Sequence, residues 1–254
     1  MSLSRSSRRC FSCWKSIRRQ FKKYRRIVCM RRSWAYGVLS TLGQCLIHQI
    51  EKLLKTWKRP LPDLPHWAAV LSGETQKITQ EFHKLYDEDF REFGSISPEQ
   101  RRITAGNSWK VYILKAYGRT LQQNALRCPH TNQLIRGMPQ ITTALFSVLE
   151  PETHVIPHRG PYAGVLRCHI PLIVPEGDCG IRVGDRVYNW QMGMPLIFDD
   201  TVEHEAWNRT SKRRVVLFID FLRPLPVPLA TLNKLMIWLI GHSPFIGRAL
   251  RASL

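Results

Sequence analysis

Two stretches decide the fold of this chain: TALFSVLEPETHVIPHRGPYAGVLRCHIPLIV at residues 143–174 and MPLIFDDTVEHEAWNRTSKRRVVLFIDFLRP at residues 194–224. Both alternate apolar and polar residues and are interrupted by Pro, Gly and Asp, which predicts short strands joined by turns. Two imidazoles, His158 and His204, stand at the ends of predicted strands, and Arg214 follows the second by ten residues. The sequence therefore predicts strands that carry two candidate metal ligands and a basic residue.

The same alternation continues outside these stretches. Predicted strands lie at residues 109–117, 143–150, 163–174, 180–188, 194–199 and 213–221. Gly184 and Asp185 sit between alternating runs and predict a hairpin turn. Many short strands separated by turns indicate a barrel or sandwich, whereas apolar residues at helical spacing predict an amphipathic helix over residues 66–91. The predicted fold is mainly β, with flanking helices.

Charge divides the chain into a basic arm and a nearly balanced remainder. Residues 1–60 contain 16 Lys and Arg and one acidic residue, whereas the other 194 residues contain 22 basic and 18 acidic residues. Pro-rich breaks at 60–65 and 225–228 mark boundaries. We therefore assign residues 1–60 to a basic N-terminal arm, 61–224 to a domain with a helical lead-in, and 225–254 to an apolar C-terminal helical tail. We expect a short helix over Leu235–Ile240 to cover the strands or lie on a membrane.

The basic arm has the composition of a segment that binds phosphate-rich surfaces. Its apolar residues recur every three or four positions, which predicts a helix with an apolar stripe on a basic background. Those residues are Cys10, Phe11, Trp14, Ile17, Phe21, Tyr24 and Ile27. The pattern favours an anionic membrane surface over nucleic acid or a merely solvated tail. We expect no nucleic-acid partner.

Three features bear on the cellular compartment. The uncharged stretch at 33–50 contains Ser, Thr, Gln and His among its apolar residues, so we expect an interfacial or packed segment rather than a spanning helix. No signal-peptide layout is visible. The seven cysteines have no disulfide-framework spacing. We therefore expect reduced thiols and a cytoplasmic protein that is peripheral to the inner membrane.

Alternation also places basic side chains on an inner face. Arg167 and His169 are two residues apart and share one face of their strand, and Arg214 shares a face with Val216 and Phe218. Burying a charge is costly unless it is paired. The pattern therefore predicts an anionic occupant. The alternative is that each cation faces solvent or pairs with a carboxylate such as Glu150, Asp199 or Asp220.

Residues 97–224 resemble the aspartyl/asparaginyl β-hydroxylase family of Fe(II)/2-oxoglutarate dioxygenases. The motifs that carry the resemblance are FSVLEPETHVIPHRGP at 146–161, LRCH at 166–169, WQMGMPLIFDDTVEHEAWN at 190–208 and RRVVLFIDFLRP at 213–224. Within the family, the bacterial branch of ornithine-lipid and lipid A hydroxylases is the more similar. That likeness rests on ISPEQRRITAGNSWKVYILKAYG at 96–118 and RCPHT at 127–131.

The resemblance implies a double-stranded β-helix, the cupin-like jelly roll, and assigns roles to six residues. His158 and His204 look like the catalytic Fe(2+) ligands. Arg214, helped by Ser147, looks like the partner of the distal carboxylate of 2-oxoglutarate. Arg167 and His169 look like the groups around the other carboxylate and the metal. O2 is the implied cosubstrate.

One position departs from the wider pattern of such oxygenases. The common triad is two histidines and a carboxylate, but the acid's position two residues after His158 is Gly160. Asp199 or Asp200 could supply the acid, although capping of a turn is the competing role. The remaining histidines, 48, 66, 83, 130, 154 and 242, lack a motif and are expected to be structural or exposed. Trp109, Trp190 and Trp207 would wall the pocket or fill the core.

Three functions remain open from the sequence. The first is hydroxylation of an aliphatic carbon on an acyl chain of a membrane lipid, of the ornithine-lipid or lipid A type. The second is β-hydroxylation of an aspartyl or asparaginyl residue in a peptide or small molecule. The third is a non-catalytic β-helix that binds an anion or acts as a scaffold at a membrane.

Overall fold

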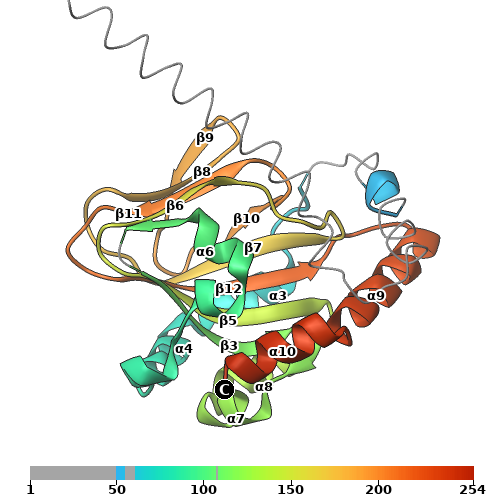
Figure 1. Cartoon of the computed structure of the whole chain (residues 1–254), viewed down its shortest axis with the longest axis horizontal. Helices are drawn as coiled ribbons and strands as arrows, with labels where there is room; N and C mark the ends of the chain where they lie inside the picture. The colour runs from blue at the N-terminus through green and yellow to red at the C-terminus, as the bar shows by residue number, and fades with distance from the viewer. Residues whose placement is uncertain (1–49, 55–60, 107) are drawn as a thin grey trace, which may run out of the picture. The chain divides into compact units, whose positions relative to one another are not determined.

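The structure is a computed structural model that describes residues 50–54, 61–106 and 108–254. The described residues form one compact unit, in which two layers of strands are flanked by helices (Figure 1). The predicted arm helix and residues 33–49 lie outside the described residues. This unit contains the sequence motifs at residues 146–224.

Among the described residues, twelve strands form two sheets, and every strand pairing is antiparallel. The larger sheet has the order β1 (Arg91–Glu92), β3 (Trp109–Ala116), β5 (Ile141–Leu149), β12 (Arg214–Leu222), β7 (Val165–Ile173) and β10 (Leu196–Phe198), with β4 (Arg119–Thr120) paired to β3. The smaller sheet has the order β2 (Thr104–Gly106), β6 (Thr153–His158), β11 (His204–Asn208), β8 (Cys179–Val183) and β9 (Arg186–Asn189). From β5 to β12 the chain alternates between the sheets except at the β8–β9 hairpin, which is the winding of a jelly roll. The predicted fold class is confirmed.

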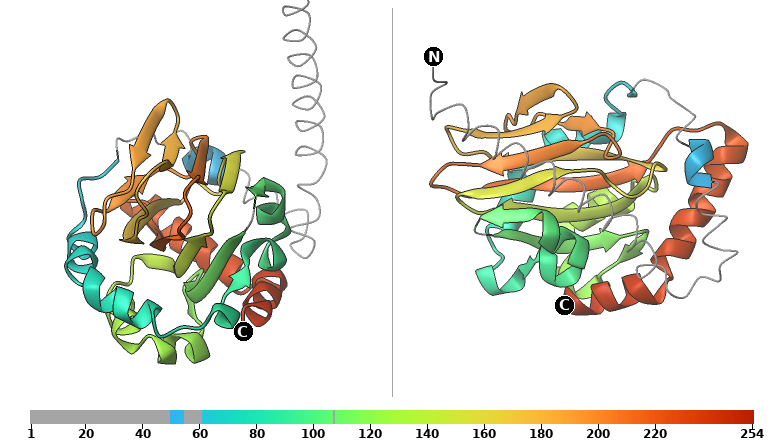
Figure 2. Two further views of the ribbon diagram at one scale, coloured as in Figure 1. Left: turned by 90° about the vertical axis from the view of Figure 1, so that its left-hand side faces the viewer. Right: turned by 45° about the horizontal axis from the view of Figure 1, so that its top comes forward.

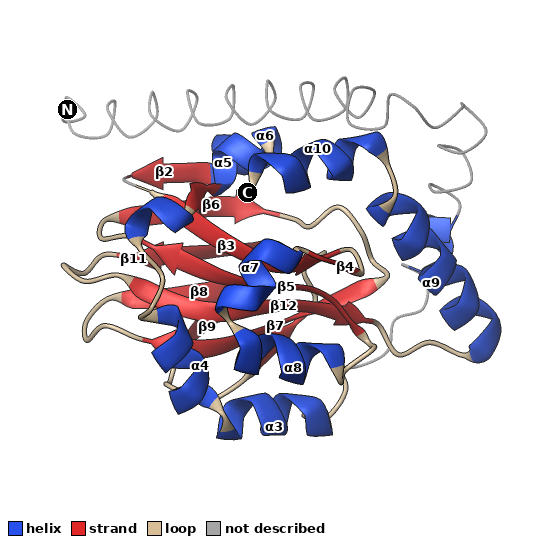
Figure 3. Ribbon diagram, turned by 90° about the horizontal axis from the view of Figure 1, so that it is seen from below, coloured by secondary structure: helices blue, strands red, loops and turns tan. Residues whose placement is uncertain are grey.

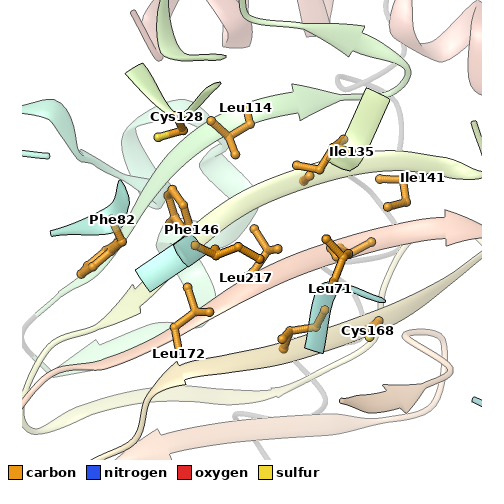
Figure 4. Close-up of a cluster of buried hydrophobic side chains, with 14 of the residues drawn as sticks. Leu71, Phe82, Leu114, Cys128, Ile135, Ile141, Phe146, Cys168, Leu172 and Leu217 are labelled. Atoms are coloured by element: carbon orange, nitrogen blue, oxygen red, sulfur yellow. The ribbon is translucent and has the colours of Figure 1, made fainter. Parts of the chain in front are cut away.

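Helices cover the outer face of the larger sheet. They are α3 (His66–Gly73), α4 (Thr75–Phe82), α7 (Gln122–Arg127) and α8 (Pro129–Arg136), and Figure 3 shows them on one side of the sheet. Leu71 and Phe82 from the helices pack with Phe146 and Leu217 from the strands in one buried cluster (Figure 4). Phe146 is fully buried, and removing such a side chain costs about 3–5 kcal/mol. This cluster fixes the larger sheet on one side and leaves its other face to the smaller sheet.

The space between the sheets contains the second cluster. Val216 and Phe218 of β12 belong to it, whereas Val215 and Leu217 belong to the helix-covered cluster. The predicted alternation is therefore confirmed on β12, because Arg214 shares the face of Val216 and Phe218, which pack between the sheets. Figure 2 shows the strands of the two sheets as separate layers. Any group that faces inward on these strands is shielded from bulk water.

Two details of the predicted secondary structure are wrong. The single helix predicted over 66–91 is two helices, because the chain leaves helical geometry at Glu74 (φ −98°, ψ 9°). Gly73 is a poor helix former, and the hydroxyl of Thr75 donates to the carbonyl of Ser72. A short 3₁₀ turn, η1 (Asp87–Asp89), replaces the predicted final helical turns. The predicted strand ranges also omitted β6 and β11, although His158 and His204 do lie at the strand ends expected of them; both strands are short and carry few apolar residues.

The C-terminal tail forms two helices rather than the single short one predicted over 235–240. They are α9 (Val227–Gly241) and α10 (Pro244–Ala252). Met236 and Ile237 on α9 pack with Ile50 and Leu54 in a third cluster. Residues 50–54, part of the predicted arm, therefore pack against the folded unit. In the part of the chain that is described, no helix is long and apolar enough to cross a membrane.

Candidate active site between the two sheets

His158 and His204 lie side by side in the smaller sheet. His158 ends β6 and His204 begins β11; the two are register partners, and their ring centroids are 4.1 Å apart. Their Nδ1 atoms lie 2.9 Å from the carbonyl oxygens of Ile156 and Val202. Because a carbonyl can only accept, each Nδ1 carries a proton, which leaves Nε2 as the nitrogen of each ring that can bind a metal. Metal-binding histidines usually have this arrangement.

The electrostatics of the pair suit a cation. Burial and the neighbouring His204 lower the pKa of His158 to about 4, so this imidazole is neutral at pH 7. Asp200 Oδ1 lies 3.2 Å from His204 Nε2. Burial alone would raise the pKa of Asp200, but the Arg167 charge and the contact with His204 lower it to about 2. A lone pair and a carboxylate oxygen at this distance repel each other unless a proton or a metal ion lies between them.

Asp200 fills the place of the missing acid after His158. A Cβ atom at Gly160 would lie 1.5 Å from Oδ2 of Asp200, and the Gly160 amide donates to the Asp200 carbonyl at 2.7 Å. The carboxylate therefore occupies the side-chain space of residue 160. Among the described residues no set of three or more His, Cys, Asp or Glu side chains is arranged to hold a metal. The candidate ligand set remains the two histidines.

Gly160→Ala should disturb the site directly, because the new methyl group overlaps the Asp200 carboxylate. We expect a loss of about 1–3 kcal/mol of unfolding free energy, the usual cost of overpacking, together with weaker iron binding. Thermal unfolding and metal titration measure the two effects. Gly73→Ala is the matched control, because no atom lies within 4 Å of its added Cβ. Equal behaviour of the two variants would contradict the close approach of Asp200 to residue 160.

Arg167 has its own carboxylate partners. It forms ion pairs with Asp200 and, at 2.9 Å between Nε and Oδ1, with Asp220. Its guanidinium also lies 4.1 Å from the ring centroid of Phe218. The Arg167 charge is therefore compensated within the chain. Of the three carboxylates that the sequence suggested as partners, Asp220 is the one that pairs with it. The contact of Arg167 with a cosubstrate remains a prediction. Asp199 caps the following turn by accepting hydrogen bonds from the Thr201 amide and hydroxyl.

Arg214 differs from Arg167 because no described carboxylate pairs with it. It is 2% exposed, its Nη1 donates to the Ser147 carbonyl at 3.3 Å, and its Nε has no partner among the described residues. The guanidinium lies 4.4 Å from the ring centroid of Trp190. Burial lowers the pKa of Arg214 to about 10, so it remains charged at pH 7. A buried cation in this state favours an anionic ligand.

His169 adds further unsatisfied groups to the same space. Neither of its ring nitrogens, nor Nε1 of Trp190, has a hydrogen-bond partner among the described residues. Burial, followed by the charges of Arg214 and Arg167, holds the pKa of His169 well below its usual range. The ring packs edge-on against Phe198 at 5.2 Å between centroids. Buried polar groups are normally paired, so these nitrogens are candidate contacts for a polar ligand.

The six residues predicted from the sequence lie in one inter-sheet region. The ring of Phe198 lies between the histidine pair and the group of Arg214 and His169, because it contacts both His204 and His169. The Ser147 hydroxyl accepts a hydrogen bond from Trp109 Nε1 at 2.9 Å, and its carbonyl accepts one from Arg214; its contact with a cosubstrate remains a prediction. Asp220, named from the sequence as a possible partner of an inward cation, lies opposite Arg167 in the register of β12 against β7.

The other aromatic and imidazole side chains follow the expectations in part. Trp109 and Trp190 are buried in the inter-sheet cluster, whereas Trp207 lies on the outer side, where its Nε1 donates to Asp178 at 2.5 Å. His66, His83 and His242 are exposed, and His130 and His154 are half-buried beside glutamates. His48 lies outside the described residues.

Comparison with known proteins identifies the family. The aspartyl/asparaginyl β-hydroxylase family matches residues 72–224. The chain is 43% identical to the ornithine lipid ester-linked acyl 2-hydroxylase of Rhizobium tropici over 72% of this chain and 67% of that protein. It is 28% identical to the human aspartyl/asparaginyl beta-hydroxylase over 71% of this chain but only 26% of that protein.

A solved structure of a 2OG-Fe(II) oxygenase family oxidoreductase from Burkholderia pseudomallei aligns with a TM-score of 0.41 at 11% identity, over 63% of this chain and 84% of that one. A similarity at that level does not bear on function, and the strand order itself defines the fold. The match to the family covers both histidines and Arg214, and more than half of the chain. The chain therefore belongs to the aspartyl/asparaginyl β-hydroxylase family.

Proposed function

We propose that this protein is an Fe(II)- and 2-oxoglutarate-dependent dioxygenase that hydroxylates an aliphatic carbon on an acyl chain of a membrane lipid. The observation that carries the cofactor assignment is Arg214, a buried cation with no carboxylate partner among the described residues. It shares the inter-sheet space with two histidines whose Nδ1 atoms donate to backbone carbonyls, which leaves each Nε2 as the candidate metal-binding atom. A divalent metal ion would bind the two histidines, and a dicarboxylic acid bound beside it would compensate the charge of Arg214.

Each residue of the site has a role in this proposal. His158 and His204 would hold the iron, and Arg214 would bind the distal carboxylate of 2-oxoglutarate in a bidentate pair. His169 would exchange a hydrogen bond with the bound 2-oxoglutarate. When bound, Fe(II), 2-oxoglutarate and O2 supply the oxidising power for hydroxylating an unactivated carbon. The aromatic rings of Trp190 and Phe198 exclude water from the space in which this occurs.

The lipid substrate is supported by the relatives and by charge. The identity to the Rhizobium acyl hydroxylase is 43%, against 28% for the human aspartyl/asparaginyl beta-hydroxylase. The 16 basic residues within 1–60 favour attachment to an anionic membrane. An aspartyl or asparaginyl residue in a peptide is the second candidate, because the family includes such an enzyme. A non-catalytic β-helix that binds an anion or acts as a scaffold is disfavoured, since it would not need His158 and His204 together with the buried Arg214.

Mass spectrometry of lipids tests the substrate. Lipid extracts from cells with and without the gene should differ in one lipid class by the mass of one oxygen atom, located on an acyl chain by fragmentation. The purified protein should also consume 2-oxoglutarate faster when that lipid is added in vesicles. Stimulation by an Asp-containing peptide with no change in any lipid would support the second candidate instead.

We also propose that the protein works at the cytoplasmic face of the inner membrane, held there partly by the basic arm. Deletion of residues 1–46, which contain 12 basic and no acidic residues, should weaken binding to anionic vesicles at low salt by about tenfold or more, because each Lys or Arg near such a surface contributes roughly 1 kcal/mol. The cut precedes Ile50, which packs against α9. Vesicle sedimentation measures the effect.

The same variant separates binding from chemistry. Its consumption of 2-oxoglutarate without lipid should be unchanged, whereas hydroxylation of lipid in vesicles should fall. Binding of the intact chain should also decrease as salt rises, since exposed charges are screened. Equal vesicle affinity of the deleted and intact chains at low salt would show that the arm has another partner.

A further inference from the structure

The outward side of α9 (Val227–Gly241) is apolar although it faces solvent. Four of its residues are large, hydrophobic and exposed: Val227 (79%), Leu235 (50%), Trp238 (55%) and Leu239 (36%). Along this exposed side Lys234 is the one charged residue of the helix. A surface helix normally places charged and polar residues there. The helices α4 and α8 of this protein follow that rule, with Lys77 and Arg136 outward.

The fold already uses the opposite side of α9. Asn233 is 1% exposed; its Oδ1 accepts a hydrogen bond from the Tyr162 hydroxyl, and its Nδ2 donates to the Gly164 carbonyl, both at 2.7 Å. Met236 and Ile237 pack in the third cluster. The exposed apolar residues are therefore not needed to attach the helix. They form a separate surface that has no cover among the described residues.

The segment that carries this surface is basic. Residues 221–254 contain four basic residues and no acidic residue; Arg223 pairs with Asp199 at 2.6 Å, whereas Lys234, Arg248 and Arg251 are exposed. An apolar strip that carries a lysine and an exposed tryptophan, in a basic segment, matches the interface of an anionic bilayer, where aromatic rings lie at the headgroup level. A second copy of this chain fits less well, because a symmetric contact would bring like charges together. The helix has 15 residues, a length of about 22 Å, which suits lying on a bilayer.

The helix also adjoins the site. The segment held by Asn233 begins at Gly160, whose amide is bonded to the Asp200 carbonyl. At the other end of the helix, Gly241 accepts a hydrogen bond from Arg119 at 3.1 Å, and its Cα packs closely on Tyr117. Figure 1 shows α9 along the end of the sheets at which β7 and β12 meet the helix. A bilayer on the outer side of α9 would thus be near the loop that leads to the histidines.

We propose that the outward side of α9, formed by Val227, Leu235, Trp238 and Leu239 with Lys234, docks on the surface of an anionic lipid bilayer. This contact is distinct from the basic arm. Only the purpose of this contact, to bring the acyl chains of the bilayer to the site, depends on the proposed lipid substrate. The contact itself involves no iron, no 2-oxoglutarate and no residue of the site.

Quenching of tryptophan fluorescence by lipids with brominated acyl chains tests the contact. The intact chain would be mixed with phosphatidylglycerol–phosphatidylcholine vesicles at low salt and at about 1 M salt, where the Debye length falls to about 3 Å and the attraction of the arm is screened. We expect Trp238→Phe to lose a distinct part of the quenching at both salt concentrations. The signal is the difference from the unaltered chain, so other tryptophans cancel.

A double variant measures how much the surface contributes to binding. Leu235→Asp with Trp238→Asp should weaken vesicle binding at high salt by about tenfold or more, because it removes apolar area and adds negative charge. Leu126→Asp with Val187→Asp is the matched control, since both residues are exposed (76% and 58%) on other elements. The control should bind vesicles as the unaltered chain does. Consumption of 2-oxoglutarate without lipid should be equal in all three proteins.

The outcomes separate this proposal from the proposed function. Unchanged quenching in Trp238→Phe, or equal vesicle binding by the α9 variant and its control, would overturn the docking surface even if the lipid is hydroxylated. A loss of self-association in the α9 variant, with vesicle binding unchanged, would also overturn it and assign the surface to a second copy. Loss of quenching and binding as expected would support docking even if no lipid proved to be the substrate.

Discussion

His158→Ala and His204→Ala should each abolish iron-dependent consumption of 2-oxoglutarate while the protein remains folded. The two imidazoles are the candidate protein ligands, and each would bind the metal through Nε2 because its Nδ1 donates to a backbone carbonyl. Removal of either halves the ligand set, so we expect iron affinity to fall by about a hundredfold or more, at least the 10–100-fold lost when outer partners of ligands are removed. Metal titration and a 2-oxoglutarate assay measure the two effects.

The control for these variants lies on the same strand. His154→Ala removes an imidazole from the outer side of β6, where its Nε2 contacts Glu205 at 2.8 Å. Iron affinity and turnover should be unchanged in this variant. Because His204 is 3% exposed, its replacement also leaves a small cavity, and circular dichroism with a thermal unfolding curve shows whether the fold survives. Retained turnover in both His158→Ala and His204→Ala would refute the ligand assignment.

The inner face of the strands could be read from the sequence because a strand has a fixed period. Arg167, His169 and Arg214 were placed inward by alternation alone, and the structure places them there. The roles of His158 and His204 came from the motifs. The period gives the direction of a side chain but not its partners, and for that reason Arg167 and Arg214 looked equivalent.

The partners depend on contacts between distant segments, which leave no periodic signal. Asp220 faces Arg167 through the register of β12 against β7, and Asp200 reaches the space beside Gly160 through a turn. The break between α3 and α4 likewise involves distant contact, because the Ser72 hydroxyl donates to the carbonyl of Gly193. The exposed apolar side of α9 was hidden for a related reason: only packing shows which side of an apolar helix is used.

The two arginines differ in their partners. Arg167 is bound to two carboxylates, which keeps Asp200 ionised beside His204. Arg214 has no carboxylate partner among the described residues; it donates to the Ser147 carbonyl and lies over the Trp190 ring, and burial lowers its pKa to about 10. Arg167 therefore orders the carboxylate beside His204 without a ligand, whereas a bound anion would compensate the charge of Arg214. This difference makes Arg214 the sharper test of the cosubstrate.

Arg214→Lys should weaken 2-oxoglutarate binding by an order of magnitude or more. A bidentate pair with a carboxylate needs the planar guanidinium, which Lys cannot reproduce, and a hydrogen bond to a charged group contributes about 1.5–3 kcal/mol. The apparent affinity for 2-oxoglutarate measures the loss. Arg182→Lys is the matched control, because Arg182 pairs with Glu205 at 2.6 Å in the smaller sheet. Unchanged affinity in Arg214→Lys would move the distal carboxylate elsewhere, with Arg167 as the next candidate.

Arg214→Met distinguishes a ligand-binding arginine from one that only supports the fold. Removing an unpaired buried charge while keeping much of the side-chain volume should leave the ligand-free protein as stable as before or more stable. The increase in thermal midpoint that 2-oxoglutarate causes in the unaltered protein should disappear, because that increase depends on the affinity of the folded state for the ligand. A destabilised ligand-free variant that still gains the full midpoint shift would mean that Arg214 supports the fold and that the cosubstrate binds without it.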